Sequence, residues 1–157
     1  MMSKRAIITM TTILFLCLFL GILNAGCSGV PPPNLGITGG HLGPCPATPN
    51  CVSSENADQG HAVEPLVYAT SRAEAMSGLK KIILGMKRTK IVRENDDYLR
   101  VEFTSAVFRF VDDVEFRFDD TAKVIHLRSA SRVGKSDFGV NRTRAEKIRS
   151  LWKALGK

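Results

Sequence analysis

The sequence lacks the short motifs that mark the best-known kinds of catalytic site. It contains no G-x-S-x-G segment, no H-E-x-x-H segment, no G-x-x-x-x-G-K segment and no dinucleotide-binding glycine fingerprint. The adjacent carboxylates Asp112 and Asp113 lie in an extended segment, where neighbouring side chains point to opposite faces and do not cooperate as a catalytic pair. These absences favour a protein without catalytic activity.

Cysteine is scarce, with four residues in a chain of 157. Two of them lie in or next to an N-terminal apolar run, which leaves Cys45 and Cys51 as an isolated pair. In an oxidising compartment such a pair predicts a disulfide. A metal site that adds His41 and His61 and a redox dithiol are the alternatives, but the spacing lacks the close Cys-x-x-Cys pairs of zinc and redox modules. No cofactor is therefore predicted.

Acidic residues are fewer than basic ones, 15 against 22, so the formal net charge is +7. This surplus is compatible with attraction to anionic lipid or another polyanion, although a modest surplus is also typical of simple solubility. No recognised nucleic-acid-binding motif accompanies the charge, and no nucleic-acid partner is predicted.

The long hydrophobic run of the sequence lies near its N-terminus. Two basic residues precede an apolar run from Ala6 to Leu23, and small residues lead from there to Cys27. These are the parts of a secretory signal. The small pair directly before Cys27 resembles a bacterial lipoprotein signal, in which the cysteine is acylated and becomes the first mature residue. The resemblance implies a signal peptide over residues 1–26 and lipidation of Cys27, with palmitate as an acyl chain.

An uncleaved transmembrane anchor is the alternative, because the apolar run is just long enough to span a bilayer. Leu23 lies one position before the usual place of leucine in a lipoprotein signal. In both cases the domain is exported and held at a membrane, which predicts a cell-envelope location. Ser28 stands where an aspartate typically signals inner-membrane retention, so the outer membrane is favoured if the cell is Gram-negative.

The rest of the chain divides into a tether and one domain. Residues 27–43 are rich in glycine and proline without hydrophobic periodicity, and they predict a partly extended tether. Residues 44–157 predict an α+β domain. A capping box from Ser71 to Glu74 begins a helix that runs to about Lys87. A second helix is expected to open near Asn141, which is a good N-cap residue.

Between the two helices, apolar and polar residues alternate as they do in antiparallel strands with one buried face and one wetter face. Strands are predicted over residues 89–94, 98–105, 108–118 and 123–130, and residues 61–68 could add a short edge strand. The predicted fold is an antiparallel four- to five-stranded sheet with two helices packed on one face.

The segment from Arg128 to Arg144 joins the last strand to the last helix and is too polar to belong to a core. A helix N-terminus with Arg142 and Arg144 would suit an anionic ligand. The alternative is a structural network in which Asp112, Asp113, Asp137 and Glu102 pair with the arginines; both hypotheses stay open. The candidate ligand or network residues, expected to cluster in space, are Asp112, Asp113, Arg128, Ser129, Ser131, Arg132, Ser136, Asp137, Asn141 and Arg142.

Several of these motifs together resemble one known family. They are Cys45-Pro46, Pro49 to Ser54, Asp112 to Val114, Arg128 to Gly134, Ser136-Asp137 and Gly139 to Asn141. In combination they are similar to the family catalogued as domain of unknown function 1499, over about Leu42 to Leu155. The resemblance implies a bacterial envelope or plastid protein and brings no established activity, substrate or cofactor.

The sequence therefore predicts an envelope lipoprotein, tethered to a membrane, whose domain has a binding or structural role without catalysis. The predicted partners are the membrane itself through the lipid anchor and an anionic small molecule, a lipid headgroup or an envelope protein. The alternative is a small hydrolase that uses His126, Asp137 and a serine of the polar segment.

Overall fold

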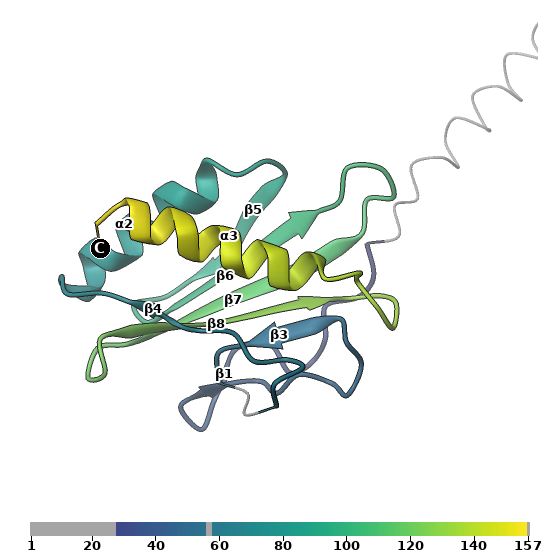
Figure 1. Ribbon diagram of the computed structural model, residues 1–157, viewed down its shortest axis with the longest axis horizontal. Helices are drawn as coiled ribbons and strands as arrows, with labels where there is room; N and C mark the ends of the chain where they lie inside the picture. Colours follow the sequence, from purple (N-terminus) through teal and green to yellow (C-terminus); the bar gives the residue numbers. More distant parts are fainter. Residues whose placement is uncertain (1–27, 56–57, 157) are drawn as a thin grey trace, which may run out of the picture.

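The computed structural model describes residues 28–55 and 58–156, so the predicted signal peptide and Cys27 lie outside the described residues. The described chain forms one α+β domain with three layers (Figure 1). Two helices lie on one side of an antiparallel sheet, and a small hairpin lies on the other. This confirms the predicted fold class. In the described ranges no helix is both long enough and apolar enough to cross a membrane.

The sheet is built around a four-stranded meander. Its strands are β5 (Thr89–Glu94), β6 (Tyr98–Thr104), β7 (Val111–Asp119) and β8 (Val124–Ser131), each antiparallel to the next. Two short strands, β3 (Cys51–Ser53) and β4 (Leu66–Val67), pair with opposite halves of β8. The sheet thus has six strands, more than the four or five predicted, because β8 is paired on both sides.

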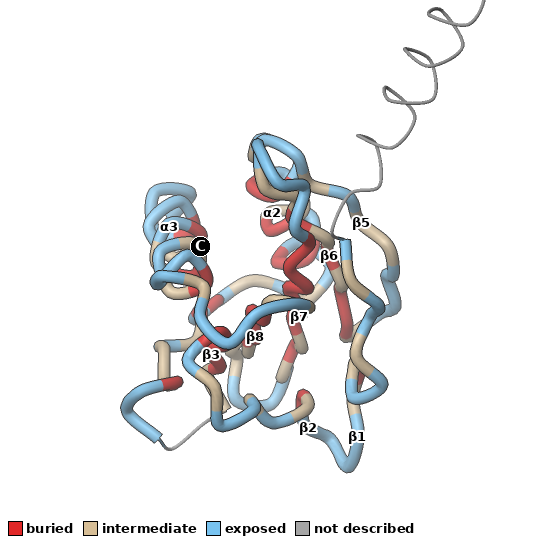
Figure 2. The backbone as a smooth tube through the Cα atoms, turned by 90° about the vertical axis from the view of Figure 1, so that its right-hand side faces the viewer, coloured by how far each residue is buried: buried red, intermediate tan, exposed pale blue. Residues whose placement is uncertain are grey.

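The two helices cover one face of this sheet. Helix α2 (Arg72–Leu84) begins at the capping box that was predicted, since the Ser71 hydroxyl accepts from the Glu74 N–H and the Glu74 carboxylate accepts from the Ser71 N–H. Helix α3 (Val140–Ala154) runs antiparallel to β8 (Figure 1). Figure 2 shows their buried residues turned inward and their exposed residues outward. The core between the layers includes Leu79, Ile83, Leu99, Val101, Val114, Phe116, Ile125, Leu127, Ile148 and Trp152.

The opposite face of the sheet is covered by a hairpin made of β1 (Ile37–Thr38) and β2 (His41–Leu42). This hairpin lies within the glycine- and proline-rich stretch that the sequence predicts as a tether. From Gly36 onward the stretch packs on the domain instead of extending away from it, because Glu115 accepts from the Gly36 N–H at 2.7 Å and Glu55 accepts from the Leu42 N–H at 2.6 Å.

Candidate functional site

The ten candidate residues lie near the ends of β7 and β8, but the structure divides them between the two faces of the sheet. Successive side chains of a strand point to opposite faces. Asp112, Ser129 and Ser131 therefore face the helices, whereas Asp113 and Arg128 face the hairpin. The residues therefore form two clusters, one on each face of the sheet, and not the single cluster that was expected.

On the helix side, Asn141 is the centre of the network. Its Oδ1 accepts from the Ser129 hydroxyl at 2.6 Å and from Arg144 Nη1 at 2.5 Å. Its Nδ2 donates to the Asn50 carbonyl and to the Ser131 hydroxyl, both at 3.0 Å. The side chain is fully buried, and all of its amide hydrogen-bonding groups have partners. Asn141 thus joins the residue before β3 to β8 and α3.

Arg144 extends this network to β7. Its guanidinium pairs with Asp112, donates to the Ser129 hydroxyl at 2.9 Å and lies 4.8 Å from the centroid of the Phe103 ring. The carboxylate, the hydroxyl and the aromatic face together hold the cation close to the start of α3. This arginine is therefore not free to bind an anionic ligand.

The N-terminus of α3 is capped by Asp137 and not, as expected, by Asn141. Gly139 is the N-cap residue with φ of 79° and makes no side-chain cap bond. Asp137 Oδ1 accepts from the Gly139 N–H at 3.0 Å, and Oδ2 accepts from the Asn141 N–H at 2.7 Å. The Ser136 hydroxyl accepts from the Phe138 N–H at 3.3 Å. A carboxylate of the protein therefore occupies the place that an anionic ligand would take at this helix end.

Arg142 points away from both clusters. It donates to the carbonyl oxygens of Ala62, at 2.8 Å, and Gly60, at 2.9 Å. In the same loop, His61 Nδ1 lies 2.6 Å from Asp58 Oδ2, and this hydrogen bond raises the pKa of the His61 imidazole. Arg142 therefore fixes the loop that precedes β4.

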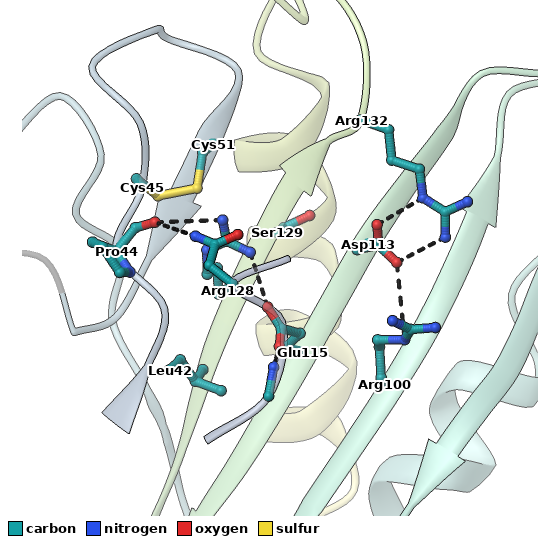
Figure 3. Close-up of polar contacts among 12 residues, drawn as sticks. Leu42, Pro44, Cys45, Cys51, Arg100, Asp113, Glu115, Arg128, Ser129 and Arg132 are labelled. Carbon is teal, nitrogen blue, oxygen red and sulfur yellow. Dashed lines mark hydrogen bonds and ion pairs between the residues drawn. A yellow bond between two sulfur atoms is a disulfide. The ribbon is translucent and has the colours of Figure 1, made fainter. Parts of the chain in front are cut away.

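On the hairpin side, Arg128 and Glu115 form an ion pair of 2.9 Å (Figure 3). Both side chains are buried, with relative exposures of 2% and 0%. The Glu115 carboxylate also accepts from the Tyr98 hydroxyl and the Gly36 N–H, each at 2.7 Å. Burial and the hydrogen bond to Glu115 raise the pKa of the Tyr98 phenol. The second nitrogen of Arg128 reaches the Pro44 carbonyl at 3.4 Å.

Pro44 is held there by the disulfide between Cys45 and Cys51, which confirms the predicted pair. Cys51 lies in β3, opposite Ala130 of β8. The disulfide thereby fixes the end of the hairpin segment against the edge of the sheet, beside the Arg128–Glu115 pair (Figure 3).

A second buried ion pair lies on the same face, between Arg132 and Asp113. Arg132 Nε and Nη2 donate to the two oxygens of Asp113 at 2.7 and 2.9 Å, and Nη2 also donates to Glu102 at 2.5 Å. The hydrogen bond to Asp113 is the main cause of a raised pKa of Arg132. Arg100 Nε lies 4.0 Å from Asp113 (Figure 3).

Two buried side-chain nitrogens in the described part of the chain have no hydrogen-bond partner, Nε of Arg100 and Nε of Arg128. Tyr98, Arg100 and Glu115 were not among the predicted residues, although they occupy the wetter face of strands that were predicted. The alternation of polar and apolar residues could have placed these three side chains on the wetter face. It could not have shown that they lie close together, because that depends on the register of β6, β7 and β8.

The structure does not assemble the hydrolase alternative. His126 faces the hairpin side, where its Nδ1 lies 3.2 Å from the Ser54 hydroxyl, whereas Ser129 and Ser131 face the helices. Burial and Arg117 lower the pKa of His126. Glu55 lies 3.9 Å from the same Nδ1, but a catalytic triad needs the serine and the carboxylate at different ring nitrogens.

The described part of the chain offers neither a groove beside the ten candidate residues among its two larger grooves nor a group of metal ligands. Two grooves on the helix layer have volumes of about 1090 and 730 Å³, and neither of them is lined by a candidate residue. In residues 28–55 and 58–156 no group of three or more His, Cys, Asp or Glu could hold a metal ion.

A family model described as "Protein of unknown function (DUF1499)" matches residues 41–151. No curated protein matches the chain.

Proposed function

The chain belongs to the DUF1499 family of proteins of unknown function, and from that premise we propose that it is a non-catalytic domain of an envelope lipoprotein. In this proposal, lipid on Cys27 holds the domain at a membrane, and the polar segment Arg128–Arg144 is a structural network. The family description assigns no activity, so the proposal is supported by the chain's own residues.

One observation carries the structural role of the segment. Each of the ten candidate residues makes at least one side-chain hydrogen bond to another group of the protein. An anion site needs donors that are both unpaired and accessible. Asp137 already fills the helix N-terminus, and the unpaired Nε of Arg128 is buried. The segment therefore ties α3, β3 and the hairpin to the sheet, and an anionic small molecule is the least favoured of the predicted partners.

Membrane attachment is supported by the sequence before Ser28. The apolar run from Ala6 to Leu23 and the small residues before Cys27 resemble a lipoprotein signal. Several acyl chains give stable attachment, since each buried methylene contributes about 0.8 kcal/mol. Ser28 favours the outer membrane if the cell is Gram-negative. An uncleaved transmembrane anchor is the second candidate mode of attachment.

Metabolic labelling with a fatty-acid analogue tests the attachment. We expect the wild-type chain to carry the label and Cys27→Ala to lose it, since the thiol of Cys27 is the proposed acceptor. Cys17→Ala is the matched control, because Cys17 lies inside the apolar run, and it should keep the label. Label that survives Cys27→Ala, in a chain still found in the membrane fraction, would favour the transmembrane anchor.

A further inference from the structure

Exposed apolar side chains gather at one end of the domain. They lie on the loop between β6 and β7 and on the loop between β8 and α3 with the first residue of α3. We define the apolar tip as these six residues, with their relative exposures: Val107 78%, Phe108 67%, Phe110 39%, Val133 36%, Phe138 97% and Val140 50%.

The two loops are neighbours in space. Thr104 pairs with Val111 at the base of the first loop, and the Arg132 N–H donates to the Val111 carbonyl at the base of the second. Figure 1 shows both loops at the same end of the sheet, and Figure 2 views the molecule from that end. Apolar residues that are 30 positions apart in the sequence thus share one surface.

The most exposed of these side chains contribute little to the fold. Phe138 is almost fully exposed and has φ of 53°, a left-handed conformation that is unfavourable for a residue with a side chain. Arg109 has φ of 59° between Phe108 and Phe110, whose ring centroids are 5.6 Å apart. Exposed apolar patches of this kind mark surfaces that bind a partner or a membrane.

The chain enters the domain at this same end. Ser28 to Val30 lie between the two loops in Figure 1. A Cβ atom built on Gly29 would lie 2.8 Å from Arg132 Cβ and 2.8 Å from Val133 Cγ1, so the entering backbone passes directly against the tip. Only four residues separate Leu23, the end of the apolar run, from Ser28. The five residue steps from Leu23 to Ser28 span at most about 18 Å.

We propose that the apolar tip inserts into the headgroup region of the bilayer to which the N-terminal segment attaches. The short connection brings this end to the lipid whether Cys27 is acylated or the apolar run spans the membrane, so the inference rests on the proposed attachment but not on its chemistry. The exposed cations Arg88, Arg109 and Lys135 lie on or beside the tip and complement anionic lipid headgroups. Aromatic side chains with adjacent cations are typical of membrane interfaces.

The test places a tryptophan on the tip of the full chain. Phe138→Trp is reconstituted into vesicles of phosphatidylcholine and phosphatidylglycerol that carry bromine near the headgroup end of the acyl chains. The native Trp152 is buried and provides the baseline of the wild-type chain. Val67→Trp is the matched control, since Val67 is 64% exposed and pairs with Val124 at the other end of β8. The seven residue steps from Val124 to Ser131 separate the two ends by about 23 Å.

We expect bromine to quench most of the added emission of Phe138→Trp and little of that of Val67→Trp. If the chain sediments with the vesicles but bromine quenches the two variants equally, or quenches neither, the proposed orientation of the tip is overturned. The proposed attachment would still stand. A chain that does not sediment with vesicles would overturn both proposals. A further measurement uses aqueous iodide as a quencher in the absence of lipid. If the Phe138→Trp indole becomes more shielded from iodide as the protein concentration rises, the tip binds a second copy of the chain and the bilayer proposal is overturned.

Discussion

Buried charge is the main feature of this domain at the scale of single residues. Asp113 and Glu115 are fully buried on the hairpin side, and their charges are balanced by Arg132 and Arg128. Such a pair need not be more stable than two apolar side chains of the same volume. Removal of one partner is different, because the remaining charge stays buried without compensation.

Because Arg132 keeps Glu102 as a partner, we predict that Asp113→Ala destabilises the domain by about 1–3 kcal/mol, the cost of buried donors that lose their acceptor. The carboxylate accepts two of the three hydrogen bonds of Arg132 and lies near Arg100, whose Nε has no hydrogen-bond partner. Urea unfolding followed by circular dichroism measures the change. Asp96→Ala removes an exposed carboxylate and should stay within about 0.5 kcal/mol of the wild type. Similar losses for both variants would contradict a structural role for the buried pair.

At the scale of elements, the strands of the meander could be predicted because their alternation is long enough to read. Residues 98–105 and 123–130 were expected as strands, and β6 and β8 cover nearly the same residues. Strand β3 could not be predicted in this way, because its three residues are all buried and show no alternation. Pairing with β8 defines it, and that pairing is a tertiary contact. The same holds for the two-residue strands of the hairpin.

The start of α3 shows how a correct residue type was given the wrong role. Asn141 is a good N-cap residue, but its side chain is buried among β3, β8 and α3, where its four hydrogen bonds are used. The capping passes to Asp137, four residues earlier. A sequence pattern indicates which residues suit a helix start, but it does not show which of them has a more favourable partner elsewhere.

This assignment predicts that Asp137→Ala destabilises the domain by about 0.5–2 kcal/mol through the loss of a helix cap. Asp137→Asn should recover most of the loss, because the amide oxygen can still accept from the Asn141 N–H. Ser136→Ala serves as the control, since its hydroxyl accepts only one long bond, at 3.3 Å from the exposed Phe138. Thermal melts compare the three variants. A loss for Asp137→Asn as large as for Asp137→Ala would favour an ion pair of Asp137 over a capping role.

At the scale of the whole molecule, the sheet has two different covers. Helices bury its apolar face, and the hairpin with the disulfide buries ion pairs on its polar face. The polar cover depends on backbone N–H groups of the stretch 36–42 that reach Glu115 and Glu55. Burial raises the pKa of the Glu55 carboxyl. The hydrogen bonds from Arg117 and from the Leu42 N–H outweigh burial, so the pKa lies below its ordinary value.

The disulfide should therefore stabilise one cover much more than the other. Closing the short loop between Cys45 and Cys51 contributes about 2 kcal/mol in the chain-entropy model. Replacing both cysteines, Cys45→Ser with Cys51→Ser, removes this constraint from Pro44, whose carbonyl accepts from Arg128. We predict a folded variant that is less stable by about that amount, with local opening of the hairpin.

Hydrogen exchange measured by mass spectrometry resolves where the opening occurs. The amides of Gly36 and Leu42 should exchange faster in the double variant, because Glu115 and Glu55 hold them only while the hairpin is in place. Amides paired between β6 and β7 should keep their protection, since the helix layer and the meander do not involve the disulfide. Asp96→Ala, with an unchanged hairpin, should leave both regions as in the wild type. Faster exchange in all strands alike would show that the two covers unfold as one unit, and the disulfide would then stabilise the fold globally.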